Sequence, residues 1–396
     1  MSTLRTVPLH RITGQETGPP RLVELPDGTP VWLVTRYDDV HQVLNDQRFG
    51  RAPVEAPGAP PVGDSPSVLK SREAIGRQDG GAHLRLRRAV GRAFTPRAVA
   101  HLRPWVADVI EQLLDGLVKQ GPPGDLVRDY AMPLPSLVMH RLLAVEEVPF
   151  ETIFHWSQHA MAGASADPEE GARARAELAE FAGGLLAARR EAPGDDLVSS
   201  VVVAAQGEGG IPESALVNLI STMIIGGHDT TMTMLGNSLL YLLTEQPVAW
   251  QRLRTGEEAA AALVERLLHL IPIGDPAEGA GHLVTAGADI GVGGVTIPAG
   301  ALVSTDRLAA HHDPAAFPGD LHDPEALFAP LPRPTLAFGA GRHYCVGTWL
   351  ARAELQLGLH RLAVRLPRLR LAVDAEEVEW RHGSITRSPV RLPASW

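Results

Sequence analysis

The chain has 396 residues, a formal net charge of −10 and 44% hydrophobic residues, which excludes wholesale disorder and argues against a nucleic-acid-binding protein. Its single cysteine excludes an intrachain disulfide and any metal site built from several thiolates. It has no uncharged apolar run of about 18 residues and no basic start followed by an apolar stretch, so we expect a cytoplasmic protein without a membrane span.

The first half of the chain begins with a short β portion and continues as helices. Residues 21–36 alternate turns with apolar stretches and predict a small hairpin, and residues 37–49 predict a helix. Residues 51–66 are rich in Pro, Gly and Ala, which predicts a long loop that we expect to act as a lid. Residues 83–94 predict a further helix, and nearly every segment of 98–270 has helical spacing.

The second half adds one long helix and a second β portion. Residues 212–247 predict the longest helix, residues 288–303 predict strands with a Gly-Gly turn, and residues 346–365 predict a last long helix. The chain shows no internal repeat and no linker. We therefore expect residues 1–396 to form a single domain that is mainly α with a smaller β portion.

The longest predicted helix is apolar almost all round, so it should run through the core. Inside it lie Gly226 and Gly227, and each glycine costs about 1 kcal/mol relative to alanine in a helix. Either close packing against another helix or the approach of a large flat group would explain them. Asp229 and Thr230 follow, and the Thr230 hydroxyl can bond back to the carbonyl of Gly226 and loosen the helix there.

The lone cysteine, Cys345, lies in the sequence LAFGAGRHYCVG directly before the last long helix. A helix N-terminus stabilises a thiolate through its unpaired amide groups and its dipole. One thiolate is sufficient as the axial ligand of a haem. The alternative is a buried cysteine that acts as a small hydrophobe, which is the commoner role of a free cysteine.

His83 and Arg87 are four residues apart and hence share one helix face. Both side chains can donate hydrogen bonds to a carboxylate, and arginine can do so with two nitrogens. The same spacing is common on solvated helix faces, so these two residues carry little weight alone. Beside a haem they would offer donors for a propionate.

These segments resemble the cytochromes P450, in particular soluble bacterial members, over essentially the whole chain. The sequence FGAGRHYCVG, residues 338–347, matches the family's haem-binding loop at each fixed position, and GGHDTT, residues 226–231, resembles its oxygen-activating segment. GAHLRLRRAVGRAFTPRAV, residues 81–99, resembles the helix that bears two propionate contacts. WLVTRYDDVHQVL, residues 32–44, is similar to the early strand and helix.

The resemblance implies a triangular α/β fold with haem b between the long central helix and the helix after the cysteine loop. It implies Cys345 as the iron ligand, and Asp229 and Thr230 as the acid–alcohol pair that delivers protons. The residues expected around the cofactor are His83, Arg87, Gly226, Phe338, Gly339, His343, Cys345 and Gly347. We expect Ile225 and Met234 to contribute apolar walls of the substrate pocket.

The function implied is a monooxygenase that takes electrons from a separate ferredoxin. It would insert one oxygen atom from O2 into a bulky apolar small molecule such as a secondary metabolite, and we expect a monomer with neither nucleic acid nor membrane as partner. Two alternatives remain open, namely radical coupling or peroxide-driven oxidation at the same iron, and a non-catalytic haem-binding scaffold. A basic patch for the ferredoxin is predicted from Arg85, Arg88, Arg92, Arg97, Arg342 and Arg352.

The sequence departs from the family at two places. Where the family has Glu-x-x-Arg on a late helix, this chain has Arg266 and His269, with Glu265 out of phase, and Val284 stands where a third propionate-binding arginine is usual. We predict a charge-swapped tie between Arg266 and one acidic residue of the segment 319–328. The candidate acids are Asp320, Asp323 and Glu325. The alternative is that Arg266 turns to solvent and the tie is lost.

Overall fold

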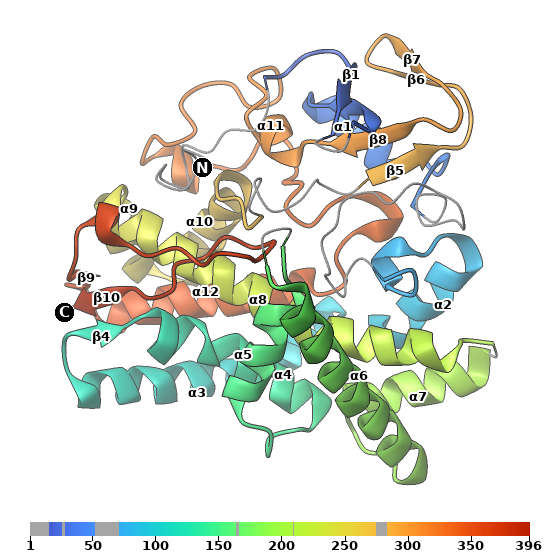
Figure 1. Ribbon diagram of the computed structural model, residues 1–396. Helices are drawn as coiled ribbons and strands as arrows, with labels where there is room; N and C mark the ends of the chain where they lie inside the picture. The colour runs from blue at the N-terminus through green and yellow to red at the C-terminus, as the bar shows by residue number, and fades with distance from the viewer. Residues whose placement is uncertain (1–15, 26–27, 52–70, 164–165, 209, 275–282) are drawn as a thin grey trace.

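The computed structural model describes residues 16–25, 28–51, 71–163, 166–208, 210–274 and 283–396. Most of these residues are helical (Figure 1). The helices are α1 Tyr37–Asn45, α2 Gly80–Gly91, α3 Pro96–Gln120, α4 Pro133–Leu143, α5 Phe150–Ala160, α6 Pro168–Glu191, α7 Leu197–Glu208, α8 Glu213–Thr244, α9 Pro247–Arg252, α10 Glu257–Leu270, α11 Arg307–His311 and α12 Thr348–Arg365. Short 3₁₀ turns, such as η9 Gly341–His343, and one π-helical turn, η6 Val127–Ala131, connect some of them.

The strands form three small sheets. They are β1 Arg21–Glu24, β2 Pro30–Val34, β3 Phe49–Gly50, β4 Gly124–Asp125, β5 Leu283–Ala286, β6 Ile290–Val292, β7 Val295–Ile297, β8 Leu302–Thr305, β9 Arg370–Leu371 and β10 Pro393–Ser395. The largest sheet has the order β1-β2-β8-β5-β3, in which β2 and β8 are parallel, and the smaller ones are β4-β10-β9 and β6-β7. The hairpin predicted for residues 21–36 is confirmed, with Arg21 opposite Leu33.

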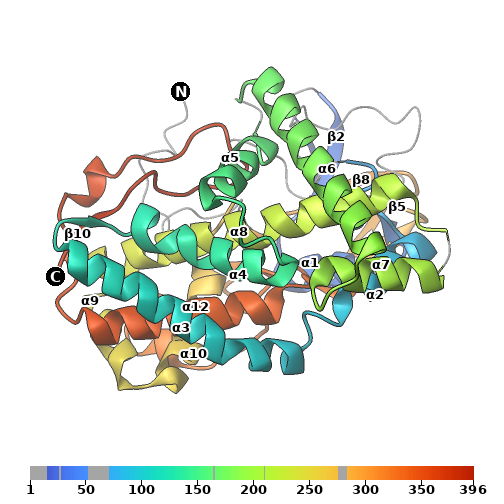
Figure 2. The same cartoon turned by 90° about the horizontal axis from the view of Figure 1, so that it is seen from below.

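The strands that precede and follow the helical region in sequence gather at one corner of the molecule. Figures 1 and 2 show this corner with β1, β2, β5 and β8, whereas β10 lies at another end of the molecule, beside the C-terminus, and helices make up most of the rest. α8 runs through the middle between the other helices. Its 32 residues are buried for most of their length, as its all-round apolar sequence predicts.

Local sequence explains where several helices begin and end. α8 begins directly after Pro212 and stops before Pro247, within the range predicted for it. The predicted helix 37–49 stops at Asn45, because Phe49 pairs with Ala286 of β5 instead. The loop predicted for residues 51–66 lies outside the described residues, except for Arg51.

The buried apolar side chains form two large clusters. The larger is built from α2 to α10 and α12, and the smaller joins α1, α11 and the sheet through residues such as Val34, Tyr37 and Val303. None of the described helices contains a stretch apolar and long enough to cross a membrane.

Candidate active site

A cavity of about 210 Å³ lies between α8 and the segment that carries Cys345. The wall is mostly apolar, and α2, α4 and α12 close it. Eight residues that the sequence indicated as site residues line it together, namely His83, Arg87, Gly226, Thr230, Phe338, His343, Cys345 and Gly347. They come from segments more than 250 positions apart in the chain, so the fold alone brings them together.

The cysteine loop is held by its own backbone. The N–H of Cys345 donates to the carbonyl of Phe338 at 2.9 Å, and Gly339 has φ +72°. Gly341 has φ +64°, and a Cβ there would collide with the carbonyl oxygen of Leu44 in α1. These glycines therefore fix the turn that presents the sulfur to the cavity.

The thiol of Cys345 sits in a position with opposing electrostatic influences. Burial raises its pKa, whereas a hydrogen bond from the backbone N–H of Gly347 and the charges of Arg87, Arg352 and Arg307 lower it, and the net direction is upward. The helix start thus does stabilise the thiolate, but by less than burial disfavours it. A cation on the cavity side would add the stabilisation that is missing.

The two glycines of α8 serve different purposes. A Cβ at Gly227 would collide with the sulfur of Met139 in α4, so this glycine is required by close helix packing. A Cβ at Gly226 would meet no atom within 4 Å, because Gly226 faces the cavity. The explanation by helix packing is thus confirmed for Gly227, and Gly226 borders the open space that the other explanation requires.

The acid and the alcohol of α8 point to different sides of the helix. The Thr230 hydroxyl lies in the cavity wall and donates to the carbonyl of Gly226 at 2.7 Å, as predicted. Asp229 is fully buried behind the wall, where its carboxylate accepts from Arg381 at 2.7 Å and from the hydroxyl of Thr386 at 2.6 Å. Sequence reasoning missed Arg381 and Thr386, since no local pattern links them to α8.

Ile225 and Met234, expected in the pocket wall, belong to the buried core and are not among the residues that line the cavity. The helix advances about 100° per residue, so Ile225 faces away from the side that carries Thr222, Gly226 and Thr230. Met234 lies beyond the last lining residue of α8, Thr231. Thr222 and Met223 of α8 line the cavity, and the sequence analysis did not indicate either of them.

Cationic side chains crowd one side of the cavity. Burial lowers the pKa of His83 to about 4 and that of His343 to about 3, and their rings lie 4.3 Å apart. Burial and the neighbouring Arg307 lower the pKa of Arg51 to about 10. Arg87 donates to the carbonyl of Tyr344 at 2.8 Å. The positive charge of this cluster therefore comes from its arginines, whereas the two histidines are neutral at pH 7.

Two carboxylates of the described residues, those of Asp79 and Asp306, act on this cluster, and the charge of Asp306 raises the pKa of Arg307. Oδ1 of Asp79 lies 3.0 Å from Arg342 and 3.3 Å from Nε2 of His343, and its Oδ2 accepts the backbone N–H of Arg51 at 2.6 Å. Asp79 and Asp306 do not balance the arginines gathered here, Arg51, Arg87, Arg307 and Arg342, so the cluster is suited to a dianionic ligand. Arg51 and Arg307 were missed by the sequence analysis, because nothing local distinguishes them from solvated arginines.

The tie predicted between Arg266 and an acid of the segment 319–328 is wrong. Arg266 is only 4% exposed, yet no carboxylate of the described residues lies within 4.0 Å of it, and it donates to the carbonyl of Ala329 at 3.3 Å. Asp320 and Asp323 accept backbone N–H groups of their own turn, and Glu325 pairs with Arg252 at 3.0 Å. The alternative, that Arg266 turns to solvent, is equally wrong.

Glu265 makes the tie instead. Its carboxylate receives two bonds from Arg352 of α12, at 2.5 and 2.9 Å, and Arg352 lies over the ring of Phe338 at 4.7 Å. α10 is thus joined to the helix that follows the cysteine loop, although by a pair of residues that the family pattern does not indicate. His269 is buried against Phe317 and His311, at ring distances of 4.2 and 4.5 Å.

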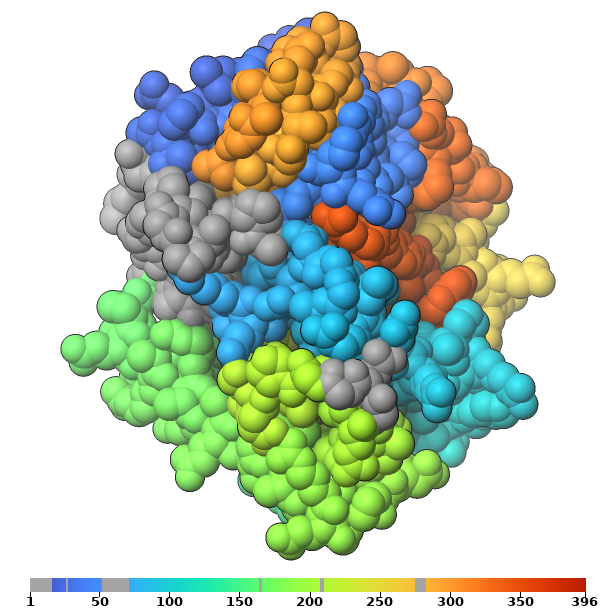
Figure 3. Space-filling model, turned by 90° about the vertical axis from the view of Figure 1, so that its right-hand side faces the viewer, coloured from blue at the N-terminus to red at the C-terminus, as the bar shows by residue number. Residues whose placement is uncertain are grey.

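These contacts also correct the predicted basic patch. Arg352 is bound to Glu265 and Arg342 to Asp79, so neither presents a free charge at the surface. Arg85 is half-buried, whereas Arg88, Arg92 and Arg97 are exposed. They belong to α2, to the turn after it and to the first turn of α3, and Figure 3 shows α2 in the middle of one face, beside the segment that leads to α12.

Comparisons with known proteins place the chain in a family. The sequence profile described as "Cytochrome P450" matches residues 275–366. The chain is 39% identical to nocardicin C N-oxygenase of Nocardia uniformis subsp. tsuyamanensis, an alignment that covers 94% of this chain and 92% of that protein. The chain belongs to the cytochrome P450 family. Its P450 fold and monooxygenase class therefore match what the sequence predicts.

Two further relatives show how broad this group of bacterial P450s is. Mycinamicin IV hydroxylase/epoxidase of Micromonospora griseorubida is 35% identical, over 96% of this P450 and 94% of that protein. The crystal structure of cytochrome P450mel 107F1, described as having biaryl coupling reactivity, superposes with a TM-score of 0.85 at 34% identity. That superposition covers 96% of this chain and 94% of the other.

Haem is the cofactor of the P450 family, and the residues of this P450 fit it. One thiol faces a cavity whose opposite wall has no side chain at Gly226. The arginines of the cationic cluster outnumber its carboxylates, so they can pair with the two haem propionates. One cavity residue that the sequence analysis missed is Glu354 of α12. Burial holds the pKa of its carboxyl well above the ordinary value.

Proposed function

We propose that residues 1–396 form one catalytic domain that inserts an oxygen atom from O2 into a bulky apolar secondary metabolite, with electrons from a separate ferredoxin. The observation that carries this proposal is the position of Cys345 and Thr230 in the wall of one mostly apolar cavity. Two relatives are named for N-oxygenation and for hydroxylation or epoxidation of nocardicin C and mycinamicin IV, which supports a metabolite of that size.

Residues of the cationic cluster would hold the cofactor. We assign Cys345 as the iron ligand and His83, Arg87 and His343 as donors to the propionates, with Phe338, Gly339 and Gly347 shaping the loop. Arg307 would supply the third arginine that the family has at the position of Val284. Val284 of β5 pairs with Val303 of β8, and Arg307 lies two residues after the end of β8. The guanidinium would therefore come from the end of the neighbouring strand rather than from β5. A thiolate-ligated haem, when bound, supplies an iron centre that activates dioxygen.

The residues of α8 would admit oxygen and deliver protons. Gly226 leaves the space beside the cavity free, and the hydroxyl of Thr230 can hold a water in the loosened turn. Asp229 stands next to it with Arg381 and Thr386, and we assign this buried group as the source from which protons reach Thr230. General acid catalysis of this kind contributes about 10² to 10⁴ in rate.

A screen of metabolites tests the proposal. Purified haem-loaded protein is mixed with candidate apolar compounds, and binding is detected as a shift of the Soret band. Each compound that shifts the band is then incubated with the protein, ferredoxin, reductase and NADPH. A product heavier by one oxygen atom, labelled from ¹⁸O₂, supports monooxygenation. Turnover with peroxide but not with O2 and reductant contradicts it.

The alternative of radical coupling is favoured by one specific observation, the resemblance to a P450 with biaryl coupling reactivity. The same screen separates the two, because coupling yields a dimer or ring without added oxygen. A scaffold without chemistry is disfavoured by the buried Asp229–Arg381–Thr386 group, which a binding protein does not require.

A further inference from the structure

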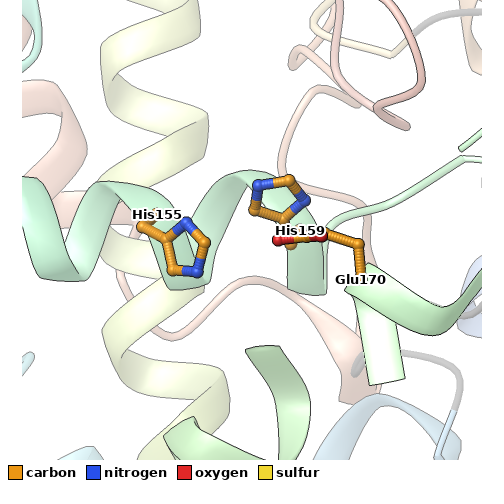
Figure 4. Close-up of side chains that lie close together, drawn as sticks. All are labelled: His155, His159 and Glu170. Carbon is orange, nitrogen blue, oxygen red and sulfur yellow. The ribbon is translucent and has the colours of Figure 1, made fainter. Parts of the chain in front are cut away.

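A second group of metal-ligating side chains lies away from the cavity, where α5 is followed by α6. His155 and His159 belong to α5, and Glu170 belongs to the first turn of α6. Figure 4 shows Glu170 reaching from the start of α6 toward His159. One ligand atom from each of the three residues lies within 4.8 Å of the other two.

The two histidines have the spacing that a metal ion requires. They are four residues apart, so they stand on the same face of α5, and their rings are 4.7 Å apart. Bonds of about 2.0–2.2 Å to a tetrahedral zinc ion place neighbouring ligand atoms about 3.4 Å apart. The three ligand atoms therefore need to converge by about 1.4 Å at most, which side-chain rotation alone supplies, because His155 is exposed and His159 and Glu170 are half-buried.

The contacts of the three side chains leave them able to bind a metal ion. An ordinary imidazole is mostly neutral at pH 7, and the neutral ring is the form that ligates a metal ion. Glu170 is paired with Arg173 at 3.8 Å, but Arg173 is 63% exposed, and such surface pairs are weak. A divalent ion can displace Arg173, because it carries two charges and binds a carboxylate oxygen at about 2.0–2.2 Å, whereas the guanidinium carries one charge and lies 3.8 Å away.

We propose that His155, His159 and Glu170 bind one divalent transition-metal ion of the zinc class, with water as the fourth ligand. Two imidazoles and a carboxylate are a donor set that zinc accepts. The bound ion would join the end of α5 to the start of α6. The connection between these helices is also held to the C-terminal segment, through Gly163 to Gly383 and Ile385 to Met161. The site is distinct from the haem cavity and does not depend on the proposed reaction.

Calorimetric titration of the full-length, haem-loaded, untagged protein with ZnCl2 tests this inference. We expect one saturable equivalent, with affinity reduced at least roughly tenfold in His155→Ala and in Glu170→Gln. His101→Ala, an exposed histidine of α3, and Glu169→Gln, the exposed neighbour of Glu170, are matched controls that retain wild-type affinity. Arg173→Gln should bind zinc more tightly, because it removes the competitor for Glu170.

Zinc-edge X-ray absorption of the same sample identifies the ligands. A first shell of nitrogen and oxygen agrees with the proposal, whereas sulfur in that shell would assign the ion to Cys345 and overturn it. The proposal also fails if wild-type protein shows no saturable binding, or if His155→Ala binds zinc as tightly as wild type. Failure of the metabolite screen leaves these outcomes unaffected.

Discussion

The guanidinium of Arg381 donates to the carboxylate of Asp229 at 2.7 Å, although 152 positions separate the two residues. The Arg381 side chain is 5% exposed and that of Asp229 is fully buried, and the second carboxylate oxygen accepts from Thr386. A charge that is far from water is stable only when it is paired and hydrogen-bonded. The C-terminal segment therefore supplies the partners of an acid in the central helix.

Replacing Arg381 should destabilise the protein strongly. Arg381→Met leaves the carboxylate of Asp229 buried without its partner, which costs about 3–5 kcal/mol in the free energy of unfolding. Asp229→Asn in the same chain should recover part of that loss. Equilibrium unfolding in urea measures both. Arg391→Met is the control, since its pair with Glu379 is exposed at 3.6 Å and should cost less than about 1 kcal/mol.

Removal of the Thr230 hydroxyl should separate oxygen consumption from product formation. Thr230→Ala should still consume reductant and oxygen, but release mainly peroxide or water, because the hydroxyl in the cavity wall no longer holds a water for proton transfer. We expect product per NADPH to fall at least roughly tenfold. Thr230→Ser keeps a hydroxyl and should restore coupling. Equal coupling in all three proteins would contradict the assignment.

The pair formed by Glu265 and Arg352 should hold the cysteine loop. Glu265→Gln removes the charge that Arg352 pairs with at 2.5 and 2.9 Å, so haem transfer to apomyoglobin should become several-fold faster. Arg266→Met, one position away, should leave haem transfer unchanged and not lower stability. Arg266 is a buried charge that donates to the carbonyl of Ala329, and an apolar side chain of similar volume avoids its desolvation. If haem transfer became faster in Arg266→Met but not in Glu265→Gln, Arg266 rather than Glu265 would hold the cysteine loop.

Electron transfer should depend on salt through the exposed arginines beside α2. With an acidic ferredoxin, the rate of reduction should fall as ionic strength rises, since the Debye length shortens to about 10 Å at 0.1 M. Arg92→Gln should lower the rate at low salt and flatten the dependence. Arg254→Gln, an exposed arginine just after α9 and distant from α2, should behave as wild type. A rate independent of salt would argue against docking at this face.

Acid should destabilise the protein through buried neutral histidines. Burial and the charge of Arg266 lower the pKa of His269 to about 3, whereas the unfolded chain titrates near 6.5. Below about pH 6.5 the unfolded state thus binds a proton that the folded state does not, so stability is full above that pH and is lost as pH falls toward 3. The slope is about 1.4 kcal/mol per pH unit for this imidazole.

Urea unfolding at pH 7, 6 and 5 measures this effect. His269→Leu should flatten the dependence between pH 6 and 5 by about 1.4 kcal/mol per unit relative to wild type. His101→Ala removes an exposed imidazole and should leave the slope unchanged. If His269→Leu and wild type lose stability in parallel, another group accounts for the acid sensitivity.

The sequence by itself determined those features that depend on neighbouring residues. The loop around Cys345 can be predicted because its glycines must adopt positive φ where no side chain fits. The buried position of α8 can be predicted because its apolar residues leave no polar face. The return bond from Thr230 to Gly226 follows from helix geometry alone. Each of these depends on contacts within one turn or one loop, so the local spacing of residues is sufficient to predict it.

Only the tertiary structure decided which distant charges meet. Nothing in the sequence indicated that Asp229 pairs with Arg381, that Glu265 rather than Arg266 reaches Arg352, or that Arg51 and Arg307 join the cluster at the cavity. The choice between Glu265 and Arg266 is set by the rotation of α10 against α12, and one position along a helix turns a side chain by about 100°. Buried charges take their partners from whichever elements pack against them, and that packing is settled by the whole core.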